Sequence, residues 1–320
     1  MENEKTVEKD FHALYFTRQQ MKGTIFDIQR FALHDGPGIR SVAFLKGCPL
    51  RCKWCCNPES QRLERELAFS QEKCNASFQC VSVCEEGVHQ KERGIHTLDL
   101  SRCNYCNACV DACSSRALKI YGYEMDSAEV VNRFLQDVDY YKNSNGGITL
   151  SGGEPLFQFE FALDILQKSK ASGLHTAVET TGYVSVGRMK KILPFVDLFL
   201  YDYKITDNEL HQEYTGVSNR QIIENLKNIL NEGAKVHLRC IVIPGINDDD
   251  LHFRAIAGLA AKYPTIEKVE LMPYHEYGKH KYAGLNREYF DFGVKTINAD
   301  ASKYWLSKLK ALGCEKATIG

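Results

Sequence analysis

Three cysteines on one short stretch, Cys48, Cys52 and Cys55, are spaced as C-x3-C-x2-C. Structural zinc sites usually use two separated C-x2-C pairs. Three thiolates from one loop can instead hold three irons of a [4Fe-4S] cube and leave the fourth iron open to a chelating substrate. The alternative is a structural zinc loop or chance thiols, and the adjacent Cys56 is expected to be a bystander.

A second group of cysteines has the spacing of bacterial ferredoxins. The run from Cys103 to Cys113 is C-x2-C-x2-C-x3-C, and the run before it has serine where its second cysteine would stand. The two runs comprise Cys74, Ser77, Cys80 and Cys84, then Cys103, Cys106, Cys109 and Cys113. In ferredoxins with two clusters, the fourth cysteine of each run binds the cluster of the other run.

This crossover predicts two auxiliary clusters of unequal ligand number. One [4Fe-4S] cluster would be bound by Cys84, Cys103, Cys106 and Cys109. The first auxiliary site would keep only Cys74, Cys80 and Cys113, because Ser77 replaces a cysteine. We expect this site to hold a [3Fe-4S] cluster, a [4Fe-4S] cluster with an oxygen ligand, or nothing stable. Zinc is the alternative for these seven cysteines.

Composition and charge favour a globular cytosolic protein. The 320 residues include 40 basic and 41 acidic side chains, and 44% are hydrophobic, so wholesale disorder is excluded. The formal net charge of -1 and the lack of a basic run argue against a nucleic-acid partner. The apolar stretches are too short to cross a membrane, and the first residues lack a secretion signal.

The distribution of cysteines fits metal binding in a reducing compartment. Eleven of the thirteen cysteines lie between Cys48 and Cys113. In the cytosol, clustered thiols are far more often metal ligands than disulfides. Cys240 and Cys314 stand apart from both groups and are expected to be buried free thiols.

The elements that must position these residues follow from the hydrophobic pattern. Residues 1–22 are charged and predict an N-terminal arm, and residues 62–121 have little periodicity and predict a small insert held by metal. Residues 23–61 and 122–320 would form the main domain. Its expected strands lie near residues 24–31, 41–45, 147–150, 174–178, 196–201, 236–242 and 266–271. Its expected helices lie near residues 128–141, 160–172, 186–193, 220–232 and 249–263.

This alternation predicts an α/β fold with a parallel sheet and outer helices, closed or partly closed like a βα barrel, with no second sheet required. Polar residues follow the ends of successive strands, at the rim where active sites of such folds gather. They are Gly152, Gly153, Glu154, Glu179, Thr180, Asp202, Lys204, Arg239 and His275. The alternatives are a turn for Gly-Gly-Glu, a surface ion pair for Asp202 with Lys204, and a solvated loop for His275.

The motif C-x3-C-x2-aromatic-C resembles the signature of radical S-adenosylmethionine (SAM) enzymes. The segments around it are similar to those of the glycyl radical enzyme activating enzymes, over roughly residues 23–290. The similar segments are His34-Asp35-Gly36-Pro37-Gly38-Ile39-Arg40, Asn57-Pro58-Glu59, Ser151-Gly152-Gly153-Glu154-Pro155, Asp202-Tyr203-Lys204 and Leu271-Met272-Pro273-Tyr274-His275. The resemblance implies a partial (βα)6 TIM-like radical SAM barrel with a small ferredoxin-like iron-sulfur insert.

The resemblance also implies roles for the rim residues. Gly152 and Gly153 would pair with the amino-acid end of SAM, and Glu154 would accept from its ammonium group. Lys204 and Arg239 would hold the SAM carboxylate or ribose hydroxyls. Oxygen ligands for a monovalent cation would come from Glu179, Thr180 and Asp202, and further SAM contacts from His275 and Trp54, the latter on the adenine. Core packing is the alternative for Trp54.

The implied activity is reductive cleavage of SAM to a 5′-deoxyadenosyl radical, which takes an α-hydrogen from a glycine of a partner enzyme. Residues 35–40 would bind the partner's peptide through Asp35, Gly36, Gly38 and Arg40, unless this segment is only a tight turn. A monomer with a flavodoxin or ferredoxin reductant, in an anaerobic cytosol, is expected. The alternatives are a radical SAM enzyme acting on a small molecule or peptide, and a ferredoxin-like electron carrier.

Two questions stay open at this point. The auxiliary clusters could relay electrons, dock a reductase or only hold the insert together. The partner could belong to the decarboxylase, diol or glycerol dehydratase, choline or sulfonate lyase, alkylsuccinate synthase or formate-lyase systems.

Overall fold

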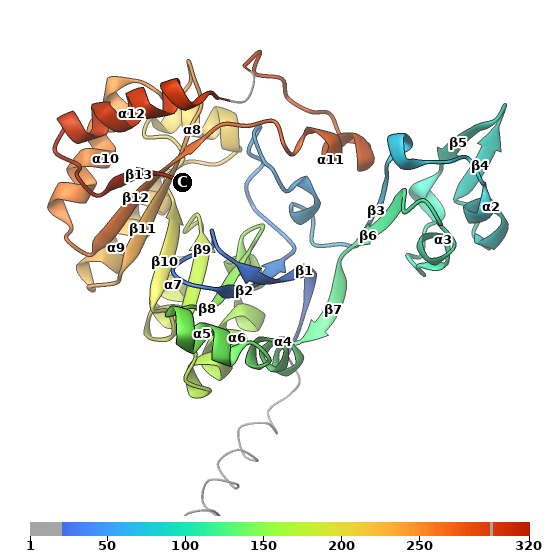
Figure 1. Ribbon diagram of the computed structural model, residues 1–320, viewed down its shortest axis with the longest axis horizontal. Helices are drawn as coiled ribbons and strands as arrows, with labels where there is room; N and C mark the ends of the chain where they lie inside the picture. The colour runs from blue at the N-terminus through green and yellow to red at the C-terminus, as the bar shows by residue number, and fades with distance from the viewer. Residues whose placement is uncertain (1–20, 295–296) are drawn as a thin grey trace, which may run out of the picture.

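A computed structural model describes residues 21–294 and 297–320. It contains a sheet of nine strands in the order β13-β12-β11-β10-β9-β8-β2-β1-β7 (Figure 1). The strands are β1 (Lys22–Ala32), β2 (Arg40–Leu45), β7 (Tyr123–Asp126), β8 (Gly147–Gly152), β9 (Thr176–Thr180), β10 (Leu198–Asp202), β11 (Val236–Val242), β12 (Ile266–Pro273) and β13 (Ala317–Ile319). In the part of this sheet that runs β13-β12-β11-β10-β9-β8-β2, each strand is parallel to its neighbours. Strand β1 is antiparallel to both β2 and β7.

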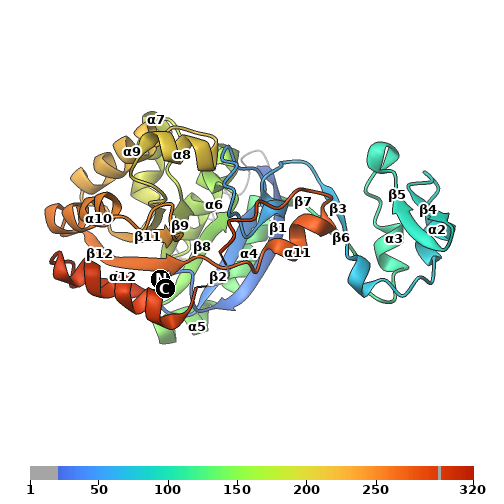
Figure 2. The ribbon, with the colours of Figure 1, turned by 90° about the horizontal axis from the view of Figure 1, so that it is seen from above.

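Helices cover the outer side of this curved sheet (Figures 1 and 2). They are α4 (Ser127–Leu135), α5 (Val138–Ser144), α6 (Phe159–Ala171), α7 (Val186–Ile192), α9 (Arg220–Asn231), α10 (Asp250–Lys262) and α12 (Ala299–Ala311). Helix α8 (Asn208–Thr215) follows β10 and lies against residues 51–53, and α11 (Lys279–Gly284) lies toward the cysteine-rich insert (Figure 2). Short 3-10 turns lie at η1 (Pro58–Ser60), η4 (Pro155–Gln158) and η5 (Leu193–Phe195). The expected partial barrel of repeated strand-helix units is confirmed.

The two faces of each strand have different environments, because successive side chains point to opposite sides. In β11, Val236, Leu238, Cys240 and Val242 are buried under the helices. His237, Arg239 and Ile241 point to the inner face of the sheet, where they line a cavity. The sequence therefore uses one face of the sheet for the core and the other for the site.

The cysteine-rich insert projects from one end of the sheet (Figures 1 and 2). The expectation that no second sheet is needed is wrong, because two small antiparallel sheets form here: β3 (Glu66–Phe69) with β6 (Leu118–Tyr121), and β4 (His89–Glu92) with β5 (Ile95–Leu98). The insert also has the short helices α2 (Gln79–Val83) and α3 (Ala108–Asp111), and the turns η2 (Gln71–Lys73) and η3 (Leu100–Arg102). We propose that residues 62–121 are one unit and that residues 23–61 and 122–320 are the other.

Some sequence-based boundaries need correction. The expected N-terminal arm lies outside the described residues except for its last two, and Lys22 already begins β1. Helix α8, helix α12 and strand β13 have no counterpart among the expected elements. The helix expected over residues 128–141 is divided into α4 and α5, because the backbone of Asp137 leaves the helical conformation.

Asp137 lies at that break and joins three segments of the fold. Its buried carboxylate accepts hydrogen bonds from Arg30 Nε at 2.8 Å and from Ser41 Oγ at 2.7 Å. The hydrogen bond from Arg30 is the main cause that lowers the pKa of Asp137.

We expect Asp137→Asn to lower the free energy of unfolding, because the buried site loses a charged acceptor. Since the pKa of Asp137 is lower in the folded than in the unfolded chain, its contribution is complete above the unfolded pKa and is lost as pH falls through the folded pKa. Chemical unfolding of both proteins across acidic pH measures this. A stability difference that grows as the pH falls would contradict it.

Candidate functional site

A cavity of about 900 Å³ lies at the C-terminal ends of the parallel strands. It brings together most of the site residues expected from the sequence. Those lining it are Cys48, Cys52, Trp54, Cys55, Gly152, Gly153, Glu179, Thr180, Asp202, Lys204, Arg239, His275 and Gly36. The segments that supply them are far apart in the sequence, and the parallel sheet places their strand ends side by side.

The loop that carries the first three cysteines is held by backbone hydrogen bonds on both sides. The N–H groups of Arg51 and Lys53 donate to the carbonyls of Thr215 and Tyr214, at 2.8 and 2.9 Å, at the C-terminal end of α8. The N–H of Cys48 donates to the carbonyl of Gln61 at 3.1 Å. The loop is therefore positioned by the sheet domain itself.

The chemistry of the three thiols fits a metal cluster. Burial raises the pKa of Cys52 to about 12 and also raises the pKa values of Cys48 and Cys55. Thiols in such an environment stay protonated unless a cation compensates the thiolate charge. A bound iron cluster supplies that compensation, and all three side chains face the same cavity. The residues present therefore fit a [4Fe-4S] cluster.

Cys56 also lines the cavity, beside this group. Its Sγ lies 4.0 Å from His275 Nε2, and burial raises its pKa to about 11.

Buried ion pairs hold the segment that follows the cysteines. Lys46 Nζ lies 3.1 Å from Glu66 Oε2, and Lys281 Nζ lies 2.7 Å from Glu59 Oε1. Arg287 pairs with Glu66 as well. Because buried charges persist only when they are paired, this network connects the cysteine loop to the start of the insert and to α11.

The inner face of the sheet carries a row of paired charges. Arg239 Nη1 donates to Glu179 Oε1 at 2.6 Å, and Arg239 Nε lies 3.8 Å from Glu270 Oε2. Lys268 Nζ donates to Glu270 Oε1 at 2.6 Å. The charge of Glu179 is the main cause that raises the pKa of Arg239, and burial raises the pKa of Glu179 despite this pairing.

Asp202 and Lys204 lie on the same face, as residues two apart at a strand end should. Lys204 Nζ donates to Asp202 Oδ2 at 3.1 Å. Burial alone lowers the pKa of Lys204, but the charges of Asp202 and the nearby thiols outweigh burial and raise it. Lys204 is therefore a cation that is oriented toward the cysteine loop.

Gly152 and Gly153 are required by close packing as well as by any ligand. Gly152 has a φ of +118°, and a Cβ there would lie 2.3 Å from the carbonyl oxygen of Leu45. A Cβ on Gly153 would lie 2.4 Å from the carbonyl oxygen of Gly47. The pair lets the end of β8 approach the segment that leads from β2 into the cysteines.

The structure places Glu154 differently from the expectation that its carboxylate contacts the ammonium group of SAM. Its carboxylate is fully buried behind the cavity and accepts hydrogen bonds from Thr180 Oγ1, Thr181 N and Thr181 Oγ1 at 2.7 to 2.9 Å. Leu156 N is a fourth donor at 3.2 Å. With these acceptor positions taken, the geometry supports a positioning role for Glu154 rather than contact with a ligand's ammonium group.

Trp54 and His275 both line the cavity. Trp54 is also buried in a small apolar cluster with Ile205, Ile243 and Tyr274, so the core-packing alternative and the site assignment hold together. The ring of His275 stacks on Tyr277, with centroids 4.3 Å apart.

The sequence predicts that four residues of the 35–40 segment bind the partner's peptide, and the structure places two of them, Gly38 and Arg40, differently. Arg40 is fully buried; its Nε donates to Thr149 Oγ1 at 2.7 Å, and burial lowers its pKa to about 10. Gly38 packs so closely that a Cβ would lie 2.5 Å from the backbone of Gly146. Both residues hold the loop from inside and do not face a peptide. Gly36 lines the cavity, and Asp35 is half-buried beside it.

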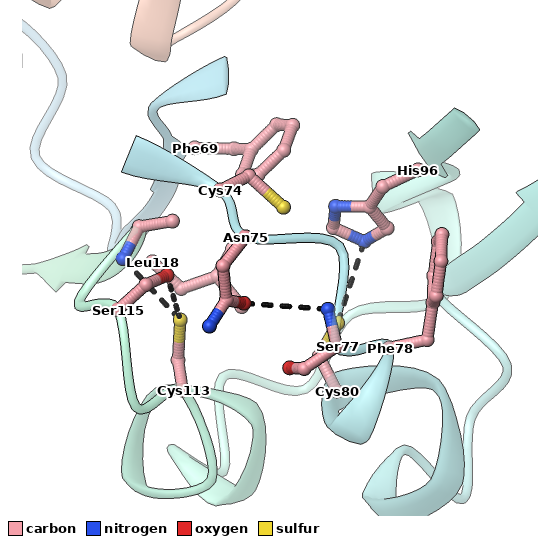
Figure 3. Close-up of a pocket in the computed structure, with 11 residues that line it drawn as sticks. Phe69, Cys74, Asn75, Ser77, Phe78, Cys80, His96, Cys113, Ser115 and Leu118 are labelled. Carbon is pink, nitrogen blue, oxygen red and sulfur yellow. Dashed lines mark hydrogen bonds between the residues drawn. The ribbon is translucent and has the colours of Figure 1, made fainter. Parts of the chain in front are cut away.

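The insert separates its cysteines into two pockets. One is lined by Cys84, Cys103, Cys106 and Cys109, which is the set given by the ferredoxin crossover. The other is lined by Cys74, Cys80, Cys113 and Ser77, together with His96 (Figure 3). The donor sets of both pockets fit iron-sulfur clusters, although the second set has only three thiols.

Several residues at these sites have no counterpart in the sequence analysis. Lys268, Glu270 and Met272 alternate along β12 and line the main cavity, so their spacing of two is a signal that could have revealed them. His89 and His96 lie on the two strands of a hairpin that has little sequence periodicity. Only the fold brings His96 to Cys80.

Two family models match this chain. The model described as Radical SAM superfamily matches residues 100–254, and the model described as 4Fe-4S single cluster domain matches residues 34–89. Together with the parallel sheet and the cysteine loop at its strand ends, these matches define a radical SAM protein.

Three relatives narrow the class. An isethionate sulfite-lyase activating enzyme from Oleidesulfovibrio alaskensis is 45% identical over 85% of this chain and 90% of the relative. A (2S)-3-sulfopropanediol dehydratase activating enzyme from Klebsiella oxytoca is 37% identical over 89% of this chain and 92% of the relative. A trans-4-hydroxy-L-proline dehydratase activating enzyme from Clostridioides difficile is 36% identical over 84% of this chain and 90% of the relative.

The chain therefore belongs to the activating enzymes of glycyl radical enzymes, within the radical SAM superfamily. It is an enzyme whose cofactors are a [4Fe-4S] cluster and SAM, and its partner is a glycyl radical enzyme. None of the helices in residues 21–294 and 297–320 has the length and apolar character that crossing a membrane requires.

We expect Glu154→Ala to destabilise the protein by about 1–3 kcal/mol for each buried donor that is left unpaired. Glu154→Gln should cost less and leave SAM affinity nearly unchanged, because an amide oxygen still accepts from Thr180 or Thr181. Unfolding curves and calorimetric titration with SAM measure both effects. A Gln variant that is stable but has lost SAM affinity would show that the carboxylate contacts SAM directly.

Proposed function

We propose that Cys48, Cys52 and Cys55 hold the cluster at which this enzyme cleaves SAM, and that the main cavity receives both SAM and the partner's glycine. The observation that carries the proposal is that these three thiols, the Gly152-Gly153 turn and the charged strand ends line one cavity. When bound, the reduced cluster and SAM together supply the 5′-deoxyadenosyl radical that takes a hydrogen from the glycine.

The protein's own residues bind and orient the cofactor. We propose that Gly152 and Gly153, which line the cavity, present backbone groups to the amino-acid end of SAM, and that Lys204 and Arg239 bind its carboxylate or ribose hydroxyls. The pairing of Arg239 with Glu179 and of Lys204 with Asp202 supports this, because both cations are already fixed in place. Trp54 would contact the adenine, and His275 would contact SAM from the loop that follows β12.

Oxygen atoms at two neighbouring strand ends could hold a monovalent cation. Glu179, Thr180 and Asp202 all line the cavity, at the ends of the neighbouring strands β9 and β10. Burial raises the pKa of Glu179, as expected for a carboxylate that lacks full compensation by Arg239. We propose these three residues as the cation site.

The identity of the glycyl radical enzyme that this chain activates is a separate part of the proposal. Isethionate sulfite-lyase activating enzymes are 45% and 43% identical to this chain, so an isethionate sulfite-lyase is the first partner to test. The electron donor would be a flavodoxin or ferredoxin, and the enzyme would act as a monomer in an anaerobic cytosol, since its clusters and the glycyl radical are sensitive to oxygen. A nucleic-acid partner is not part of this proposal.

The cluster assignment is tested by cysteine variants. After anaerobic reconstitution and reduction, Cys48→Ala, Cys52→Ala or Cys55→Ala should abolish release of 5′-deoxyadenosine from SAM, because each removes an iron ligand. Cys56→Ala is the matched control and should retain the activity of the parent protein. Full activity in any of the three variants, or its loss with Cys56→Ala alone, would show a different ligand set.

The partner site is tested at Asp35. We expect Asp35→Ala to leave uncoupled SAM cleavage intact but to reduce the glycyl radical signal on the partner several-fold in electron paramagnetic resonance (EPR). Asp139→Ala, an exposed acidic residue on α5, is the control. Equal partner activation by Asp35→Ala would show that the loop is only a turn. Turnover of a small molecule without any protein radical would favour the other radical SAM activity.

A further inference from the structure

The first auxiliary site has one thiol fewer than a [4Fe-4S] cluster requires. Cys74, Cys80 and Cys113 line its pocket, and Ser77 occupies the position of the missing cysteine (Figure 3). Ser77 is exposed to solvent. A serine hydroxyl must lose its proton to replace a thiolate, and in water this is unfavourable, so a better donor nearby would compete successfully.

His96 on β5 is such a donor. Its side chain lies in the same pocket, where it is only 6% exposed and packs edge-to-face against Phe69, with ring centroids 4.5 Å apart. Figure 3 shows the ring between Cys74 and Phe78, with its Nε2 edge toward Cys80 and its other nitrogen toward Cys74. The ring is therefore fixed by packing with one edge facing the thiols.

The two nitrogens of His96 have different partners. Nε2 lies 2.9 Å from Nδ1 of the buried His89 and 3.6 Å from Cys80 Sγ. Nδ1 is buried and has no hydrogen-bond partner among the described residues. A buried acceptor or donor without a partner is costly, and Nδ1, which Figure 3 shows directed toward Cys74, is explained if it binds metal.

This arrangement is the one that metal-binding histidines usually show. The ring nitrogen that does not bind the metal donates its proton to a neighbouring acceptor, which fixes the tautomer and the ring orientation. Here Nε2–H would donate to His89 Nδ1, leaving His96 Nδ1 as the unprotonated atom. A neutral imidazole binds iron without losing a proton, and it replaces cysteine in Rieske clusters.

We propose that His96, through Nδ1, is the fourth protein ligand of the first auxiliary cluster, with Cys74, Cys80 and Cys113, and that His89 is its positioning residue. The proposal rests on the insert binding iron-sulfur clusters. Ser77 is then not a ligand. Because imidazole is neutral, this cluster carries one negative charge fewer than the all-cysteine cluster at Cys84 and Cys103–Cys109, and its reduction potential is higher.

A single metal ion is the competing occupant. One ligand atom from each of Cys80, His89 and His96 lies within 4.8 Å of the others, which suits one ion. That set would leave Cys74 and Cys113 unused, although both line the pocket. It would also need His96 Nε2, the nitrogen already bonded to His89, and would leave the unpartnered Nδ1 unexplained. The cluster uses all three thiols and His96 Nδ1; among the described histidine nitrogens of this pocket, His89 Nε2 is the one that it leaves without a partner.

The test uses the full chain with Cys48, Cys52 and Cys55 replaced by alanine, so that only the auxiliary clusters contribute to the spectra. After anaerobic reconstitution with ⁵⁷Fe and sulfide, Mössbauer spectra count the clusters, and hyperfine spectroscopy of the reduced protein detects a directly bound ¹⁴N. Metal analysis reports zinc. In this background we expect two cubes, a strong ¹⁴N coupling and stepwise reduction, the His96 cluster first.

His96→Asn should lose the strong ¹⁴N coupling and either convert one cube to [3Fe-4S] or lose about half of the auxiliary iron. Ser77→Ala is the matched control and should retain the coupling. In His89→Gln the amide oxygen can still accept from His96 Nε2–H, so the coupling should persist, whereas His89→Ala should weaken it. The double variant Ser77→Cys with His96→Asn should regain both cubes without the ¹⁴N coupling. Its recovery would show that the loss in His96→Asn does not come from misfolding.

Several results would overturn the proposal. They are the absence of directly bound ¹⁴N in the parent, loss of cluster in Ser77→Ala, and one zinc per chain in place of the cube. SAM cleavage by the unsubstituted enzyme is measured separately. Its absence would refute the proposed function while leaving the ¹⁴N result standing, and a lack of any cluster in the insert would remove the basis of this inference alone.

Discussion

The contact between Arg239 and Glu179 fixes the position of charges on the inner face of the sheet, and the rest of the site depends on it. A guanidinium on the inner face of a sheet is tolerated only if carboxylates compensate it. Here Glu270 lies on the adjacent strand β12, and Glu179 lies on β9, two strands away from Arg239 on the other side. These pairs fix the charges before any ligand arrives. If SAM binds here as we propose, its binding requires little rearrangement, which is how preorganised sites lower the cost of reaching a reactive geometry.

The cysteine loop depends on the same principle of fixed supports. It has backbone hydrogen bonds to α8 on one side, and on the other side the segment after it is held by Lys46, Lys281 and Arg287. Lys46 is buried, and Lys281 and Arg287 are half-buried, against Glu59 and Glu66, so these charges are costly unless all partners are present. The loop, the start of the insert and α11 therefore form together, so the cluster site belongs to the folding of the sheet domain.

The sequence predicts the parts of this protein that depend on local pattern and spacing. The strand-helix alternation and the two cysteine groups are of this kind, and the structure places them as expected. Glu154, Arg40 and His96 are different. Their roles depend on which side chains meet after folding: two threonines at the end of β9, a hydroxyl on β8 and a thiol on α2. The spacing of residues along the chain does not show which of these side chains come into contact.

Trp54 gives the protein an internal optical reporter. The chain has two tryptophans, Trp54 between two of the cluster cysteines and Trp305 in the hydrophobic core under α12. Iron-sulfur clusters absorb where tryptophan emits, so a cluster bound at Cys52 and Cys55 quenches Trp54 by energy transfer over a very short distance. The emission of Trp54 thus reports whether the cluster site is loaded, whereas the steadier emission of Trp305 reports whether the core is folded.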